Sequence, residues 1–470
     1  MRIQRIDLVA ASQERTLRQD FDYHRYNNSR TENYYLFNEL FELLPVVAPA
    51  DNELYSDFQY CEIGNADKDG NISPVMLNFE NRNLEEDNYY KKIEKGDITH
   101  VSCNDILLAK VRPNLKKYVR ITADIENVFF TKAFIRIKAK QMPEIMYYCF
   151  RSVFYDDLMA ISRQGKGYPT LNEKDVATLR FDKNYIDKLF NNRDYVLKNI
   201  LLREAQISAL QKEEIPEISI IDDVFAREFG FDYSTFKMLK KMHNYPVCNV
   251  AFSNNPDLRF SAKFHRKAGE FVMSQLTALT DKKIKHFLAE PIVLGASVSP
   301  SDFDENGEAY YVSMATIKTL EIELDDTQLL SSEYFAAHTK KTLMPGDIVI
   351  ARSGVAIGKT ALVKNEFAGV FADFTMRVRL SNYSPEFTYY YFRTSYFQYL
   401  IEIYKKGLQN QNIFPIVIQE FPILDISLEE QQRIVDEIQT AIETQNSIKL
   451  KIAELRIQID TIIEDIITGN

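Results

Sequence analysis

Residues 428–466 read LEEQQRIVDEIQTAIETQNSIKLKIAELRIQIDTIIEDI, and this stretch decides how the whole chain is organised. Steps of four and three residues alternate along it without a slip, and Gln445 is the one polar position of the series. A period of 3.5 residues predicts a long helix that winds around a partner helix. The alternative is an amphipathic helix packed on a globular core, which seldom keeps so strict a period. The seam consists of Ile434, Ile438, Ala441, Gln445, Ile448, Ile452, Leu455, Ile459, Ile462 and Ile466.

A second stretch, residues 185–214, has the same period and is the predicted partner of the first. Six of its nine seam positions are apolar, so its signal is weaker. Polar positions inside a seam fix the register of two helices. We therefore expect the helices to pair within one chain, with Gln445, Arg193 and Arg203 setting the register. The second seam consists of Ile186, Leu189, Arg193, Val196, Ile200, Arg203, Ile207, Leu210 and Glu214.

The chain also overlies itself when it is shifted by 241 or 242 residues. NDILLAK at 104–110 aligns with GDIVIAR at 346–352, and YCFR at 148–151 aligns with YYFR at 390–393. Solenoid repeats are far shorter, so this offset indicates that a domain was duplicated together with its long helix. The expected division is a first domain at 1–182, a first long helix at 183–214, a connector of uncertain fold at 215–245, a second domain at 246–426 and a second long helix at 427–470.

Each domain is predicted to mix strands and helices. The apolar runs at 105–111 and 347–353 are rich in Val, Ile and Leu and are bounded by Gly, Pro or Asn, so they predict buried strands. Two tyrosine-rich stretches, 143–162 and 385–404, begin with a proline and have helical spacing. We therefore predict an α+β protein with two homologous domains and two long helices.

The composition is that of a globular protein, with 45% hydrophobic residues, 26% charged residues and a formal net charge of −10. This net charge disfavours a generally basic nucleic-acid binder, so such a role has to rest on local charge. The four cysteines are scattered without a CxxC pair, which indicates reduced thiols and neither a disulfide framework nor a zinc site. No signal peptide and no membrane span of ~18 apolar residues is expected, so we predict a cytoplasmic protein.

Basic charge is concentrated in two corresponding stretches. Residues 104–140 contain nine basic and three acidic side chains, and residues 337–380 contain seven basic and three acidic ones. Local excesses of +6 and +4 are typical of surfaces that meet a phosphate backbone, although each stretch could also be a solvated lysine face. The candidate DNA-binding residues in these stretches are Lys110, Arg112, Lys116, Lys117, Arg352, Ser353 and Lys359.

The polar loops that precede the two long helices have the same place in each repeat but different residues. Residues 162–172 read SRQGKGYPTLN and residues 404–414 read YKKGLQNQNIF. Amides can read adenine edges and Arg or Lys can read guanine, so unlike loops on one scaffold predict two different half-sites. Ordinary surface loops are the alternative. The candidate DNA-binding residues here are Arg163, Lys166, Tyr168, Lys405, Lys406, Gln409, Asn410 and Gln411.

The segment GVAIGKT, residues 354–360, resembles a phosphate-binding loop. That loop needs four residues between its glycines, in the pattern G-x-x-x-x-G-K-S/T, and only three are present here. The first repeat has no glycine pair at this place. We therefore expect a tight turn that carries Lys359, and an NTP-binding enzyme is the less favoured alternative. Other catalytic or metal-binding motifs are absent from the sequence, so no catalytic residue and no metal site is predicted.

The second half of the chain resembles the DNA specificity (S) subunits of type I restriction-modification systems. The resemblance is carried by MPGDIVIARSGVAIGKTALV at 344–363 and by KKGLQNQNIFPIVIQEFPILDISLEEQQRIVDEI at 405–438. The first half matches through NDILLAKVRPNL and the YCFRS helix, but its long helix starts with KNYIDKLFNNR and lacks the Glu-Gln-Gln of the second.

This resemblance implies a non-catalytic subunit with two target recognition domains and two long helices that form an antiparallel coiled coil. It implies a bipartite double-stranded DNA target whose nonspecific spacer is set by the coiled coil. The implied partners are two modification subunits, which bind S-adenosylmethionine and methylate adenine, and often two motor-nuclease restriction subunits. No cofactor is implied for this subunit itself. A coiled-coil scaffold that binds only proteins is the competing interpretation.

Overall fold

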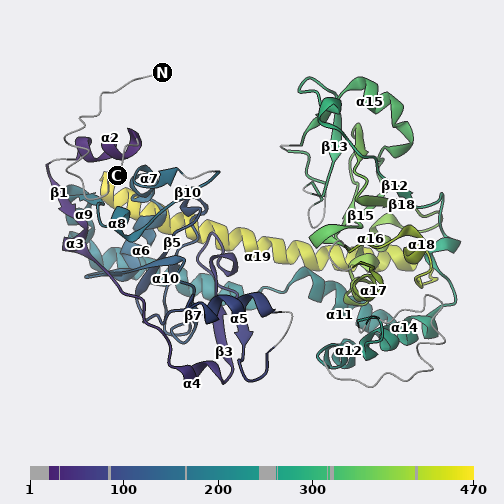
Figure 1. Cartoon of the computed structure of the whole chain (residues 1–470), viewed down its shortest axis with the longest axis horizontal. Helices are drawn as coiled ribbons and strands as arrows, with labels where there is room; N and C mark the ends of the chain where they lie inside the picture. The colour runs from purple at the N-terminus through teal and green to yellow at the C-terminus, as the bar shows by residue number, and fades with distance from the viewer. Residues whose placement is uncertain are drawn as a thin grey trace. The chain divides into compact units, whose positions relative to one another are not determined.

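The computed structural model contains two compact units, and the long helix α19 (Leu428–Thr468) contributes to both (Figure 1). Unit 1 comprises the described residues within 1–213 and 449–470, and unit 2 those within 214–448. Each unit combines a β-rich domain with helices, so the predicted α+β class is confirmed. The structure describes residues 21–30, 32–82, 86–164, 167–242, 261, 263–314, 316–317, 322–325, 327–407 and 411–469.

The domain of unit 1 is built on a four-stranded and a three-stranded sheet, beside which lie two two-stranded sheets. The larger sheet has four antiparallel strands in the order β2-β8-β5-β6. In the smaller sheet β3 pairs antiparallel with β4 and parallel with β7. The apolar run predicted as a strand forms β5, which is buried along its whole length. The strands are β2 (Phe41–Leu43), β3 (Phe58–Cys61), β4 (Val75–Leu77), β5 (Asp105–Ala109), β6 (Val119–Arg120), β7 (Phe129–Phe130) and β8 (Phe134–Ala139).

The domain of unit 2 repeats this topology. Its larger sheet has the order β12-β18-β15-β16, and its smaller sheet has the order β14-β13-β17 with one antiparallel and one parallel pairing. The same strand order in both units is what a duplicated domain requires. The strands are β12 (Val293–Leu294), β13 (Ala309–Val312), β14 (Leu329–Leu330), β15 (Ile348–Ala351), β16 (Thr360–Leu362), β17 (Gly369–Phe371) and β18 (Thr375–Val378).

Each tyrosine-rich stretch that was predicted as one helix forms two. In unit 1 these are α6 (Pro143–Arg151) and α7 (Tyr155–Ala160), and in unit 2 they are α16 (Pro385–Arg393) and α17 (Ser395–Tyr404). The break in unit 2 falls at Thr394, whose side chain accepts a hydrogen bond from the N–H of Phe397 and so begins a new helix. Helices α6 and α16 pack on the larger sheets of their units.

The first long helix pairs antiparallel with α19, as expected. It consists of α9 (Lys183–Asn191) and α10 (Arg193–Glu213), which are separated at Asn192. Lys188 Nζ donates to the carbonyl oxygen of Ile467 at 2.6 Å, and Arg203 Nε donates to Gln458 Oε1 at 3.1 Å. The two helices run antiparallel, because the residue number increases from 188 to 203 along the first while that of its partner on α19 decreases from 467 to 458. Among the described residues, no helix is both long enough and apolar enough to cross a bilayer.

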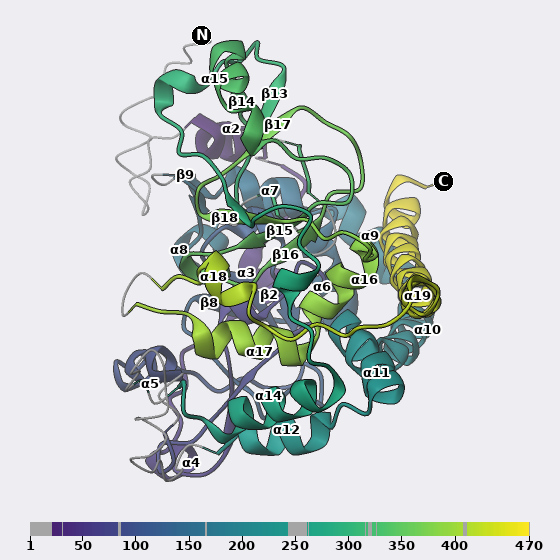
Figure 2. The same cartoon turned by 90° about the vertical axis from the view of Figure 1, so that its right-hand side faces the viewer.

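The predicted connector contains a second partner for α19. Helix α11 (Glu217–Phe229) lies along the N-terminal half of α19, where Arg227 is ion-paired with Glu437 and Glu228 with Arg433. The connector also contains α12 (Tyr233–Lys240), which lies beside α14 (Lys267–Leu279) (Figure 2). Helices α11 and α12 of the predicted connector therefore contribute to the core of unit 2, which the sequence interpretation did not foresee.

Gln445 is buried where the partner of α19 changes from α10 to α11. Its Oε1 accepts a hydrogen bond from the backbone N–H of Ile215 at 2.8 Å. Ile215 is one of the three residues between the two helices and lies outside the regular hydrogen bonds of either helix. The polar position in the seam thus satisfies the backbone at the break, which is a specific way to fix register.

The predicted seam is correct in the middle of α19 and wrong near its end. Ile452, Leu455 and Ile459 are buried, but near the end Ile463 and Ile467 are buried, whereas the expected Ile462 and Ile466 are only half-buried. A straight helix has 3.6 residues per turn, so its buried face drifts away from a 3.5-residue period. The buried face of the last turns therefore follows the period of a straight helix and not that of a strict coiled coil.

Truncating one buried isoleucine of α19 should test this packing. Ile459 is fully buried and Ile457 is 64% exposed on the same helix. Ile459→Ala should lower the free energy of unfolding by ~2–5 kcal/mol, because it leaves a cavity, whereas Ile457→Ala should change it by less than ~0.5 kcal/mol. Urea unfolding followed by circular dichroism measures both. Equal effects of the two substitutions would contradict the buried position of Ile459.

Candidate nucleic-acid interface

In unit 1 two distant stretches meet at the end of β5. Leu171 N–H donates to the carbonyl oxygen of Lys110 at 2.8 Å, and Arg112 N–H donates to that of Pro169 at 3.0 Å. The second stretch is the hairpin of β9 (Arg163–Gln164) and β10 (Pro169–Thr170), which leads into helix α8 (Glu173–Val176). The structure therefore brings Lys110 and Arg112 of the first basic stretch next to the predicted DNA-binding loop.

Unit 2 has the same junction at the end of β15. Ile413 N–H donates to the carbonyl oxygen of Arg352 at 2.9 Å, and Ser353 forms a bridge with Asn412. Asn412 also forms a bridge with Lys406, and helix α18 (Pro415–Ile418) follows. These main-chain contacts lie 242 residues after their counterparts in unit 1. Because they use backbone atoms, the side chains of the two loops can differ freely.

Both junctions carry an arginine beside an aromatic ring. The guanidinium carbon of Arg112 lies 5.1 Å from the ring centroid of Tyr168, and that of Arg352 lies 5.6 Å from the ring centroid of Phe414. The two rings are 42% and 39% exposed. A guanidinium held beside a ring keeps N–H donors for a planar acceptor such as a base edge or a phosphate. We call these the stacked pairs, Arg112–Tyr168 and Arg352–Phe414.

The backbone at the first stacked pair is strained. Arg112 has φ 52° and ψ 52°, a left-handed conformation that costs a residue with a side chain ~1–2 kcal/mol. Pro113 follows it in a short 3-10 helix. Strained residues often belong to functional sites, because surrounding contacts must hold them in place.

The second stacked pair is held differently. Arg352 Nη1 donates to the carbonyl oxygen of Asp373 at 3.1 Å. Its Nε is buried and has no hydrogen-bond partner within the described part of the chain. A buried donor without a partner lowers the stability of the fold, so the second junction, like the first, is locally destabilised at its predicted DNA-binding arginine.

Several predicted DNA-binding cations have carboxylate partners that the sequence did not reveal. Lys110 pairs with Glu173 at 2.7 Å, and Arg163 forms a bidentate pair with Asp175 at 2.8 and 3.0 Å. Burial raises the pKa of Glu173, but the hydrogen bond from Lys110 and a backbone N–H outweigh burial and leave this pKa below its usual value. In unit 2, Lys405 pairs with Glu402 at 2.5 Å. These carboxylates reduce the positive charge offered to DNA.

Lys116 and Lys117 mainly hold loops of their own domain. Lys116 Nζ donates to the carbonyl oxygen of Arg151 at 2.8 Å and lies 4.2 Å from the ring centroid of Tyr155. Lys117 Nζ donates to the carbonyl oxygen of Ile63 at 3.2 Å. A local charge count therefore overstates how many cations face solvent freely.

Some arginines of the basic stretches are structural. Arg136 is paired with Asp105 inside unit 1, with both side chains buried. Arg120 is 2.8 Å from Glu204 of α10. In unit 2, Arg379 is paired with Asp347 at 2.6 Å. None of these arginines was among the predicted DNA-binding residues.

Residues 354–360 do not form a nucleotide-binding loop. They contain a short 3-10 helix, η7 (Gly354–Ala356), and connect β15 directly to the antiparallel strand β16. A phosphate-binding loop leads from a strand into a helix, whose first N–H groups hold the phosphate. Gly354 and Gly358 have φ 76° and 88°, as a tight turn requires. The tight turn was predicted correctly, and the NTP-binding alternative is wrong.

The other predicted DNA-binding residues lie beside the turn, in the second loop or outside the described residues. Lys359 is half-buried next to this turn, and Gln411 is half-buried in the second loop. Lys166, Gln409 and Asn410 lie outside the described residues. Within the described ranges, no group of three His, Cys, Asp or Glu residues is placed to hold a metal ion.

The chain belongs to a known family. Residues 217–456, just over half of the chain, match the family described as Type I restriction modification DNA specificity domain. Members of this family are specificity subunits, the non-catalytic components of restriction-modification complexes. The predicted resemblance is therefore confirmed. No curated protein matches the chain in sequence.

Three solved structures are similar to the chain. One chain from a study of complex assembly and conformational transition of the type I R-M system is 17% identical, with 92% of this chain and 97% of that chain covered and a TM-score of 0.41. The HsdS subunit from Thermoanaerobacter tengcongensis is 16% identical, with 93% and 96% covered and a TM-score of 0.32. The type I S subunit from M. genitalium is 12% identical, with 93% and 97% covered and a TM-score of 0.36.

Substitution of Arg112 should weaken DNA binding. Arg112→Asn removes the charge while keeping a residue that tolerates a left-handed backbone, and we expect a loss of ~1–3 kcal/mol in binding free energy. Arg82 is the matched control, because it lies 4.7 Å from the ring centroid of Phe79 in the same domain but outside the junction. Fluorescence anisotropy with mixed-sequence duplexes at two salt concentrations measures both. Equal losses for Arg112→Asn and Arg82→Asn would rule out a special role for the junction.

Proposed function

We propose that this specificity subunit reads a bipartite DNA target, one half with each domain, and recruits adenine methyltransferase subunits to it. The observation that carries the proposal is the recurrence of the junction. Both units place an arginine beside an exposed aromatic ring where a loop joins a strand end, yet the loop residues differ. One scaffold with two different surfaces suits two different half-sites.

The chemistry of the two junctions supports DNA as the ligand. Arginine can bond guanine O6 and N7 with two N–H groups, and glutamine or asparagine can bond adenine. Lysines near the same loops can meet phosphates, which position a protein but carry no base information. We assign the stacked pairs to base reading, with Gln409, Asn410 and Gln411 as further candidates in the second domain. Lys110, Lys359 and Lys406 are assigned to phosphate contacts.

The proposed recognition domains are residues 1–182 and 246–426. Residues 183–214 and 427–470 supply the long helices that separate the half-sites, and residues 215–245 supply α11 and α12. The antiparallel pairing of α19 with α10 and α11 suits a stiff spacer, because both helices resist bending when their apolar faces are buried together.

The proposed partners follow from the family. Two modification subunits would bind the long helices and carry S-adenosylmethionine, and two restriction subunits complete such complexes in many systems. This subunit would bind no cofactor of its own and would act in the cytoplasm, where its DNA is.

A scaffold that binds only proteins is the second candidate function, favoured by the exposed apolar residues Leu201 and Leu202 on α10. The two functions differ in their response to salt. Contacts with phosphates make the logarithm of the binding constant fall steeply with the logarithm of salt concentration. A gel-shift titration at two salt concentrations therefore separates them, since a pure scaffold would shift no duplex at either.

The two domains should change specificity independently. Tyr168→Ala should alter the bases accepted in one half of the methylated target, and Phe414→Ala should alter only the other half, because each ring orients the arginine of its own junction. Sequencing of methylated adenines in a host that carries each variant together with the methyltransferase gives the result. Changes in both halves after either substitution would mean that the domains do not read DNA independently.

A further inference from the structure

A tight turn at residues 67–71 of unit 1 is stabilised by hydrogen bonds of its own side chains. Asp67 Oδ1 accepts the N–H groups of Asp69 and Asn71 at 2.8 and 2.9 Å, and Asp67 Oδ2 accepts from Asn71 Nδ2 at 2.7 Å. Gly70 has φ 85°, and a Cβ atom there would lie 2.1 Å from Tyr147 Oη. The turn is therefore pressed closely against its own domain, which only glycine permits at this position.

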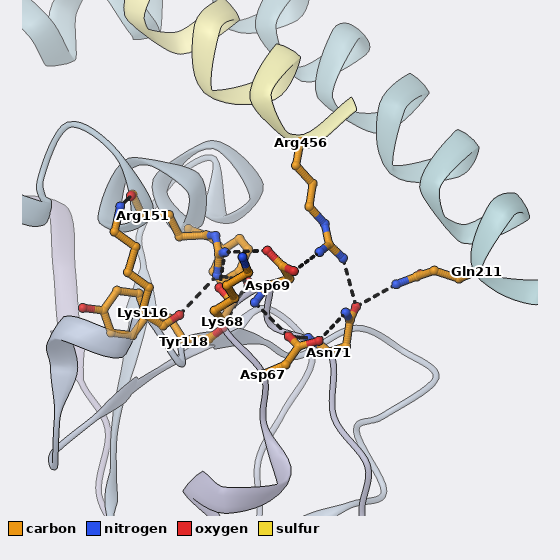
Figure 3. Close-up of polar contacts among 10 residues, drawn as sticks. Asp67, Lys68, Asp69, Asn71, Lys116, Tyr118, Arg151, Gln211 and Arg456 are labelled. Atoms are coloured by element: carbon orange, nitrogen blue, oxygen red, sulfur yellow. Dashed lines mark hydrogen bonds and ion pairs between the residues drawn. The ribbon is translucent and has the colours of Figure 1, made fainter. Parts of the chain in front are cut away.

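This turn contacts the two long helices α10 and α19 within unit 1 (Figure 3). The carboxylate of Asp69 is ion-paired with Arg456 of α19. Asn71 Oδ1 accepts a hydrogen bond from Gln211 Nε2 of α10 at 2.8 Å and one from Arg456 Nη2 at 3.4 Å. One turn thus joins the domain, α10 and α19 at a single point, which we call the helix clamp: Asp69, Asn71, Gln211 and Arg456.

The helix clamp is anchored from inside the domain. Arg151 at the end of α6 lies 3.7 Å from Asp69 and also donates to the carbonyl oxygen of Lys68. The side chains of Arg151, Arg456 and Asp69 are 12%, 19% and 28% exposed. Ion pairs this far from bulk water are screened less than exposed ones, which contribute little.

Unit 2 shows the same arginine in a simpler arrangement. Arg393 lies 242 residues after Arg151, and its side chain is ion-paired directly with Glu217 at the start of α11. It also donates to Tyr389 Oη at 2.7 Å. In unit 2 this arginine connects the domain directly to α11. In unit 1 it connects the domain to α19 through Asp69 of the turn at 67–71.

We propose that the helix clamp is a positioning device that sets the spacer length the subunit accepts between its two half-sites. This inference rests on the proposed bipartite reading. The reason is that α19 contributes to both units. A first domain that is fixed to α19 is therefore fixed to the helix that, in the proposed function, separates the two half-sites. Without the clamp, the first domain should reach half-sites displaced by one base pair, while its base-reading residues stay unchanged.

Selection of bound duplexes from a random-sequence pool by the full-length chain tests this inference. Wild type should select two half-sites with one spacer length. Arg456→Ala and Asn71→Ala should raise the share of spacers one base pair longer or shorter by about five- to tenfold, with the same half-site bases. Gln458→Ala is the matched control, because Gln458 bonds Arg203 of α10 and touches no domain residue in the described hydrogen bonds.

The outcomes separate the inference from the proposed function. A single spacer length in both clamp variants, with wild-type half-sites, would overturn the inference while leaving the bipartite reading intact. No bipartite motif from wild type would instead overturn the proposed function. Should Arg456→Ala fail to fold, Arg456→Lys keeps one charge on Asp69 but loses the second contact to Asn71, and it should broaden the spacer distribution to a smaller degree. An unchanged distribution in Arg456→Lys and Asn71→Ala would equally overturn the inference.

Discussion

Burial of the apolar face of α19 is the interaction on which the rest of the structure depends. Ile438, Ile459 and Ile463 are fully buried along this single helix, and each such side chain contributes ~1.5–3 kcal/mol relative to exposure. The helix has different partners along its length, α10 in unit 1 and α11 in unit 2. Any change that disturbs α19 therefore reaches both units, although each has its own sheets and its own core.

The two units show how a duplicated domain can diverge at its surface without losing its fold. The main-chain bonds Leu171 to Lys110 and Ile413 to Arg352 attach the variable loops to the strands in the same way. Backbone hydrogen bonds place no demand on side chains, so the loops are free to change chemistry. The backbone of the two loops is held in the same place while their side chains differ. Such an arrangement allows the specificity of a subunit to change without a change in its assembly.

Much of this organisation could be predicted from the sequence, because it depends on local pattern or on self-similarity. The heptad period predicted the long helices, and the 242-residue offset predicted that the two domains are homologous, which their common strand order supports. The packing of Ile221, Val224 and Phe225 of helix α11 into the core of unit 2 was not predicted, because residues 215–245 had no counterpart in the repeat and their fold was left uncertain. The drift of the seam to Ile463 and Ile467 depends on what packs there, which a period alone does not contain.

The candidate site was predicted in part. The arginines at the strand ends and the polar loops were identified separately, and the structure brings them together. The carboxylates Glu173 and Asp175, and the turn that carries Asp69, gave no signal, because an ion pair between distant residues leaves no pattern in a single sequence. A local excess of basic residues therefore indicates which part of the chain is a candidate DNA-binding surface. It does not indicate which of its cations lack a carboxylate partner.

The most direct test of the account is photo-crosslinking of the full-length chain to duplexes selected for binding to it, followed by mass spectrometry of the crosslinked peptides. The account predicts crosslinks to residues 163–171 from one half of the target and to residues 405–414 from the other half. Crosslinks from both halves to one domain, or to neither loop, would contradict it.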